Sequence, residues 1–178
     1  MNEIICSVCL IPTKSDQKYL DQIISSLAKK YRAYIFIPHL TVYGVLRGPK
    51  EEIGKAVDYA FKAISKFSIK ADKLDHSEVF SKTLFIQFEM NNALLEIYNK
   101  LRLKLKKYLI DCKEYDLNPH ISLIYKHGIP NKEKEEIIRS TKMKNEFVFD
   151  RCSIISATKP IEKEEDVKDF EITADTYF

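Results

Sequence analysis

The sequence predicts an α+β fold made of two similar halves related by a pseudo-twofold axis. Segments with strand and helix periodicity alternate along the chain, and the order strand, helix, strand, helix, strand occurs twice within 178 residues. No Gly- or Ser-rich linker separates the two copies, so we expect a single domain over residues 1–178. Its lobes then cover about residues 1–80 and 81–178, an order that is compatible with strands exchanged between the lobes.

The first half contains three predicted strands and two predicted helices. Apolar residues at helical spacing predict helices after Ser15 and after Pro49, and Ser15 or Asp16 can cap the first. The apolar runs between the helices predict strands. In order, the expected elements are a strand at 3–11, a helix at 15–30, a strand at 34–43, a helix from 50 to about 64 and a strand at 67–74.

The second half repeats this order of strands and helices, with one strand added at the end. Asn91 or Asn92 can cap its first helix, and Asn131 begins a short charged helix. The acidic run at 162–166 is typical of a solvated loop. In order, the expected elements are a strand at 83–89, a helix from 92 to about 108, a strand at 118–125, a helix from 131, a strand at 147–157 and a last strand near 169–173.

The composition excludes several classes of protein. Hydrophobic residues make up 45% and charged residues 31% of the chain, values unlike those of disordered or collagen-like chains. The formal net charge of +3 is too small for a nucleic-acid coat, but it permits an anionic ligand at a local site. The apolar stretch from Ile4 to Ile11 follows no basic segment and is too short for a membrane span. We therefore expect a cytoplasmic protein that makes no membrane contact.

Four cysteines raise the question of a metal or redox site. Cys6 and Cys9 form a Cys-x-x-Cys pair on a predicted strand, where an offset of three points the two thiols to opposite faces. That geometry disfavours both a shared metal ion and a disulfide, and no second pair completes a zinc set. We interpret these two residues, and the singletons Cys112 and Cys152, as small buried hydrophobes and expect neither a metal nor another cofactor.

The informative feature is a short motif that occurs once in each half. Residues 37–42 read Ile-Pro-His-Leu-Thr-Val and residues 118–123 read Asn-Pro-His-Ile-Ser-Leu. Because residues i and i+2 of a strand share a face, His39 points the same way as Thr41, and His120 the same way as Ser122. A pseudo-twofold axis would bring these four side chains into one cleft. One copy would be a weak signal, but two copies at equivalent places indicate catalysis.

Two facing imidazoles suit a reaction that needs a base and an acid together. Unperturbed histidine titrates near ~6.5, so one ring can be neutral while its partner is protonated. The hydroxyls of Thr41 and Ser122 can donate hydrogen bonds to phosphate oxygens. The residues therefore predict a phosphodiester substrate, attacked by water or by an internal hydroxyl, with no metal required.

The two motifs resemble the paired His-x-Thr/Ser signatures of the two-histidine phosphoesterase superfamily, and within it the cyclic phosphodiesterase family. The resemblance extends to residues 8–12, 83–87 and 118–125 and so spans nearly the whole chain. It implies a bilobal fold with mostly antiparallel sheets facing a central groove and helices outside. It also implies hydrolysis of 2′,3′-cyclic nucleotides or ADP-ribose 1″,2″-cyclic phosphate. We take His120 as the base and His39 as the acid, although the symmetry of the motifs permits the reverse.

Three further residues are candidates for substrate binding. Tyr125 matches the aromatic residue that family members often carry after the second motif, although its odd offset from His120 requires a bend in the strand. Tyr43 shares the predicted face of His39, where it either contacts the base or ribose or fills the interface between the lobes. Arg47 lies just past the first motif strand and could meet a phosphate.

A different class of function remains open beside the enzyme. The same groove could hold a nucleotide or an RNA end with little turnover, or process RNA ends through 2′,5′ linkages. A long RNA needs a continuous basic track. The basic residues of 100–107 are spread around their predicted helix instead of forming one face. We therefore expect the partner to be a small cyclic-phosphate nucleotide. We also expect the protein to be a monomer.

Overall fold

The computed structural model describes residues 2–110, 114–157, 159 and 161–178. In each half the main elements follow the predicted order of strand, helix, strand, helix and strand. Four α-helices and seven strands are joined by three short 3-10 helices within these residues. In chain order they are β1 (Glu3–Pro12), α1 (Lys14–Tyr31), β2 (Leu40–Pro49), α2 (Lys50–Phe61), β3 (Phe67–His76), η1 (Phe80–Lys82), β4 (Leu84–Phe88), α3 (Asn92–Leu105), η2 (Lys106–Tyr108), β5 (His120–Ile124), α4 (Asn131–Ser140), β6 (Glu146–Ala157), η3 (Glu164–Asp169) and β7 (Glu171–Tyr177).

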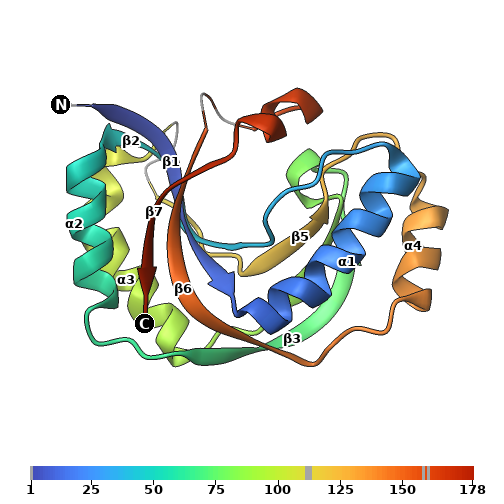
Figure 1. Ribbon diagram of the computed structural model, residues 1–178, viewed down its shortest axis with the longest axis horizontal. Helices are drawn as coiled ribbons and strands as arrows, with labels where there is room; N and C mark the ends of the chain where they lie inside the picture. Colours follow the sequence, from blue (N-terminus) through green and yellow to red (C-terminus); the bar gives the residue numbers. More distant parts are fainter. Residues whose placement is uncertain (1, 111–113, 158, 160) are drawn as a thin grey trace.

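All seven strands belong to one antiparallel sheet that bends back on itself. The strand order is β1-β2-β5-β4-β3-β6-β7, and β6 also pairs with β1. The pairing exchanges strands between the halves, because β3 of the first half pairs with β4 and β6 of the second. In Figure 1, α2 and α3 cover one side of the strands and α1 and α4 the other, so the helices lie outside. The bilobal α+β arrangement is thereby confirmed.

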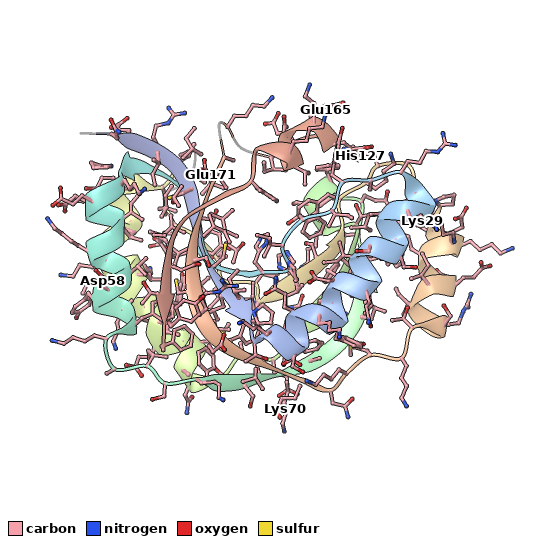
Figure 2. All side chains as sticks on the ribbon, viewed as in Figure 1. Lys29, Asp58, Lys70, His127, Glu165 and Glu171 are labelled. Carbon is pink, nitrogen blue, oxygen red and sulfur yellow. The ribbon has the colours of Figure 1, made fainter. Side chains whose placement is uncertain are left out.

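The core fills the space between the helices and the outer sheet faces. Residues that repeat at helical spacing supply its helical side, for example Leu20 and Ile24 of α1, which are at most 1% exposed. The charged side chains labelled on the outside of the molecule, Lys29, Asp58 and Lys70, point away from the sheet (Figure 2). No helix within the described residues has the length and apolar character that crossing a membrane requires.

Several predicted boundaries differ from the structure. The second strand begins at Leu40 instead of Tyr34, and β5 begins at His120, in each case within two residues after a proline that cannot donate to a ladder. Residues 164–169 form η3 instead of an open loop. The cap of α1 is Thr13, whose side chain makes no capping hydrogen bond. Asp16 is instead buried, where it accepts from the backbone N–H of Val148 at 2.7 Å.

Candidate active site

The two histidine motifs meet where β2 and β5 are paired. Leu40 lies opposite Ile121 in this antiparallel ladder. Antiparallel register then places His39 beside Ser122 and Thr41 beside His120, all on the face opposite to the buried Leu40 and Ile121. Both histidines and Thr41 line a groove of about 290 Å³. The structure therefore brings together both imidazoles and one of the two motif hydroxyls.

Both imidazoles are held in the same way. The Nδ1 atom of His39 lies 2.7 Å from the carbonyl oxygen of Ile37, and that of His120 lies 2.8 Å from the carbonyl oxygen of Asn118. Because a carbonyl can only accept, Nδ1 carries the hydrogen in each ring, and Nε2 is the nitrogen left to exchange a proton. Each acceptor lies two residues before its histidine, so the two copies of the motif orient their rings equivalently.

Burial sets the charge of these rings. It lowers the pKa of His39 below its usual value, against the opposing effect of the hydrogen bond to Ile37. Burial also lowers the pKa of His120 to about 4, and the charge of Lys82 and the neighbouring His39 contribute in the same direction. Both imidazoles are thus neutral at pH 7, which differs from the expectation that one is protonated. An anionic phosphate bound between them would favour protonation again.

A β-bulge follows each motif. Cys9 pairs with Thr41 but Val8 pairs with Tyr43, so Val42 is an extra residue in β2. In the same way Phe85 pairs with Ser122 but Leu84 pairs with Ile124. The extra residue there is Leu123. Because a bulge shifts the alternation of faces by one residue, the faces predicted directly after each motif are reversed. In β2 a second irregularity between Tyr43 and Leu46 shifts the alternation again.

The bulge at Val42 removes Tyr43 from the groove. Tyr43 is 0% exposed, and its ring packs 5.4 Å from that of Tyr115 and 5.9 Å from that of Tyr98. It does not belong to the groove lining. The prediction that Tyr43 shares the face of His39 is therefore wrong, and its ring fills the core beside α3.

The bulge at Leu123 has the opposite effect on Tyr125. This residue follows the end of β5 and lines the groove, although only 6% of it is exposed. Its ring stacks on Phe36 with centroids 4.2 Å apart and planes 5° from parallel. Phe170, which follows η3, packs edge-on against both Tyr125 and His39. Aromatic side chains thus close this end of the groove.

We call the end of the groove beside Gly44 its open end, because no aromatic side chain occupies the position there that corresponds to Tyr125. Counting from the two histidines, Gly44 occupies the position equivalent to Tyr125. A Cβ atom there would lie 2.8 Å from the Cβ of Ser7, so no side chain fits without movement. The lining at this end is mainly apolar and includes Ile5, Val45 and Ala157. The two ends of the groove therefore differ in their side chains.

The two motif hydroxyls have different surroundings. Thr41 lines the groove, and its Oγ1 lies 3.6 Å from the Sγ of Cys9. The Ser122 hydroxyl donates to the carbonyl oxygen of Ser81 at 2.6 Å. Ser122 is only 5% exposed and does not belong to the groove lining, whereas Ser81 does.

Arg47 lies outside the groove. It pairs with Ile5 across β1 and β2, is exposed, and lines a shallow depression together with Glu3 and Glu171. The depression shares Ile5 and Ala157 with the groove. Arg47 is therefore positioned beyond the open end, away from the two histidines.

The cysteines form no reactive centre in the described part of the chain. Burial raises the pKa of Cys6 and of Cys9 to about 12, and their thiols, like that of Cys152, are not in disulfides. Cys6 packs in the main core and Cys9 in a small cluster with Ile11 and Ile155, although both also border the groove. Cys112 lies outside the described residues. No set of three potential ligands for a metal ion occurs among the residues with described positions.

Several residues of the site carry no signal in the sequence. Phe36, Ser81, Lys82 and Phe170 come from segments before β2, from η1 and from the end of η3, none of which contains a motif. Lys82 lies over the ring of Phe85 at 4.1 Å, and that ring packs against His120 at 5.7 Å. Only the tertiary fold places these groups beside the motifs.

The comparisons with known proteins concern the family and the fold. A family model described as cyclic phosphodiesterase-like protein matches residues 5–159. The structure of E. coli LigT with 3′-AMP is similar over 99% of this chain and 98% of its own, at 10% identity and a TM-score of 0.60. The structure of TT0787 of Thermus thermophilus is similar over 98% and 97%, at 13% identity and a TM-score of 0.60. No curated protein matches the sequence.

Proposed function

This chain belongs to the cyclic phosphodiesterase-like protein family, and on that premise we propose that it hydrolyses small cyclic phosphates to phosphomonoesters. The substrates proposed are 2′,3′-cyclic nucleotides or ADP-ribose 1″,2″-cyclic phosphate. The observation that supports this best is the pair of equivalently anchored imidazoles, His39 and His120, lining one groove. The acid and the base that the reaction requires are both groups of the chain itself, so we propose that it proceeds without a metal.

The proposed reaction is an in-line displacement at phosphorus. The Nε2 atom of one histidine takes a proton from water as the water oxygen attacks. The bond from phosphorus to a ribose oxygen breaks, and the other histidine gives its proton to that oxygen. Thr41 donates a hydrogen bond to a phosphoryl oxygen. Ser122 is the corresponding hydroxyl residue of the second motif. Burial keeps His120 neutral before the substrate binds, as a base must be. We assign it as the base and His39 as the acid.

The nucleotide is proposed to lie with its base toward the open end. Tyr125 contributes the edge of its ring at the closed end, because its face is already covered by Phe36. Structures of E. coli LigT with 3′-AMP, ATP and NADP+ show that a protein of this fold holds nucleotides. We infer from the apolar lining beside Gly44 that a nucleoside would fit there.

A panel of cyclic phosphates tests this function. The purified protein is incubated with EDTA and each of the four nucleoside 2′,3′-cyclic phosphates or ADP-ribose 1″,2″-cyclic phosphate, and phosphorus NMR identifies the position of the phosphate in the product. We expect turnover of at least one of them, with a bell-shaped pH profile. Failure to open any of these rings would refute the proposal.

Arg47 supports an RNA-end substrate as the second candidate. Its depression adjoins the open end of the groove, where a chain extending from the nucleotide would pass. If longer substrates are used, Arg47→Ala should lower kcat/KM for a dinucleotide with a terminal cyclic phosphate and leave the mononucleotide unaffected. Equal effects on both substrates would argue against it. A binding module with little turnover would instead bind the cyclic nucleotide and leave it intact.

A further inference from the structure

A lysine outside both motifs lines the groove. Among the described residues of the lining, Lys159 is the one lysine or arginine, and none of them is an aspartate or a glutamate. With both histidines neutral, the formal charge of this lining therefore comes from one ammonium group. The roles assigned to the motif residues leave this charge unexplained, although it favours an anionic group nearby.

Lys159 stands at the open end of the groove. Through one residue of β1, Ser153 of β6 lies at the level of Thr41. Ala157, which lines the open end, is four residues farther along β6, or about 13 Å for an extended strand. Lys159 follows Ala157 by two residues. It is therefore placed to meet a part of the substrate other than the phosphate held beside Thr41.

The ammonium of Lys159 is held by a buried carboxylate. Its Nζ atom lies 2.8 Å from Oδ1 of Asp166, whose side chain is 4% exposed. The other carboxylate oxygen accepts from the backbone N–H groups of Glu162 and Lys163, each at 3.1 Å. Asp166 belongs to η3, and Figure 1 shows the chain leaving β6, forming η3 and turning back into β7. The ion pair thus ties the lysine to a structured segment.

This ion pair keeps the ammonium within reach of a ligand. The side chain of Lys159 is 53% exposed, although that of its partner is buried. An ammonium has three N–H donors, so it can bind a phosphate oxygen and stay paired with one carboxylate oxygen. A side chain held in advance also loses less conformational freedom on binding. These properties suit a site for a phosphate at the edge of the groove.

Arg47, the cation beyond the open end, is less suited to a phosphate of the same nucleotide. It lines its depression together with Glu3 and Glu171, whose carboxylates repel an anion. Of the two cations, only Lys159 lines the groove that contains the histidines. A nucleotide bound in that groove therefore meets Lys159 first.

The chemistry of the substrate indicates which group Lys159 meets. In a 2′,3′-cyclic nucleotide, C1′ with its base and C4′ with the 5′ carbon lie on the side of the ribose away from the cyclic phosphate. When the cyclic phosphate lies between the histidines and the base points to the open end, the 5′ carbon extends toward the same end. A phosphate on this carbon then extends toward Lys159.

We propose that Lys159 binds a second phosphate of the substrate, carried on the 5′ carbon of the ribose whose cyclic phosphate lies between the histidines. This proposal rests on the proposed function, since it places a further group of the same substrate. Its substrate class is a cyclic phosphate with a 5′-phosphate or 5′-diphosphate on the same sugar. ADP-ribose 1″,2″-cyclic phosphate has this pattern, and so does a nucleoside 2′,3′-cyclic phosphate that is also phosphorylated at the 5′ position.

Ligands without a cyclic phosphate test this site independently of turnover. The dissociation constants of 3′-AMP and of adenosine 3′,5′-bisphosphate are measured by isothermal titration calorimetry. We expect the wild-type protein to bind the bisphosphate about 3- to 10-fold more tightly, as for a partly exposed charge pair. In Lys159→Gln this preference should disappear. Lys159→Arg, which retains the charge, should keep it.

Lys55→Gln is the matched control. Lys55 of α2 has a side chain of similar exposure, its Nζ lies 2.7 Å from Glu51, and it is outside the groove lining. Removal of its charge should leave the preference for the bisphosphate unchanged. Loss of the preference in Lys55→Gln as well would show that net charge, and not a site at Lys159, is the cause.

The outcomes separate this proposal from the proposed function. Equal binding of the two ligands by the wild-type protein would overturn the proposal without any variant. An equal loss of affinity for both ligands in Lys159→Gln would overturn it too, since the lysine would then not distinguish the second phosphate. If the wild-type chain opens no cyclic phosphate while Lys159→Gln still removes the preference, the proposed function fails and the phosphate site stands.

Discussion

Leu40 pairs with Ile121 across β2 and β5, and this contact sets the two histidine motifs side by side. In the part of the chain that the structure describes, it is the one ladder pair between the two strands. Both residues are fully buried, and each lies between the histidine and the hydroxyl of its motif. The two motifs thus meet at an apolar pair where β2 and β5 are joined.

Loss of either imidazole should abolish most turnover. We expect His39→Ala and His120→Ala each to reduce kcat for a 2′,3′-cyclic nucleotide by about 100- to 10,000-fold, since each removes one partner of the proton transfer. The measurement is initial rate under saturating substrate. His127→Ala serves as the matched control, because His127 is exposed and lies outside the groove lining. Two single variants that retain full turnover would contradict the assignment of the site.

Stability should fall in mildly acidic solution. Burial lowers the folded-state pKa of His120 to about 4, below the value near ~6.5 of an unfolded histidine. Between these values the unfolded chain binds more protons than the folded one, so stability declines as the pH falls from about 6.5 to about 4. We expect about 1–3 kcal/mol of this decline to come from His120. Urea unfolding at pH 7 and pH 4.5 measures it, and His120→Asn should show a smaller decline. An equal decline in the variant would exclude His120 as the cause.

Two glycines should respond oppositely to alanine. At Gly44 the new Cβ would press against the side chain of Ser7, so we expect Gly44→Ala to destabilise the protein by about 1–3 kcal/mol. Gly54 lies within α2 with nothing within 4 Å of a new Cβ, so Gly54→Ala should stabilise by about 0.5–1 kcal/mol. Chemical denaturation reports both changes. Adding Ser7→Gly to Gly44→Ala should recover part of the loss, and no recovery would mean that Ser7 is not the obstacle.

The open end should determine the preference for a nucleoside. Ala157 lies opposite Ile5 in the ladder of β1 and β6 and lines this end of the groove. Ala157→Phe would fill the space, so the ratio of kcat/KM for a 2′,3′-cyclic nucleotide to that for the base-free glycerol 1,2-cyclic phosphate should fall about 10- to 100-fold. Ala63→Phe, exposed after the end of α2, is the matched control. If the ratio does not change, the base lies elsewhere.

Most of the elements were predictable because their signals are local. Helical spacing located α1, α2, α3 and α4, and Asn91 caps α3 as expected, accepting from the backbone N–H of Leu94 at 2.8 Å. The start of β2 was not predicted correctly, since residues 34–39 are apolar enough to resemble a strand but have no ladder partner. The short helix η3 was missed because its acidic composition resembles that of an exposed loop.

The sequence by itself determined the duplicated order of elements and the two motifs: the proline, histidine and hydroxyl of each motif are fixed by covalent spacing, as is their common face on a strand. The tertiary structure decided what surrounds them. A bulge belongs to two paired strands and cannot be read from one, so only pairing moved Tyr43 into the core and Tyr125 to the groove. Likewise, burial by residues distant in the chain lowers the pKa of both histidines, and η1 brings Ser81 to the site.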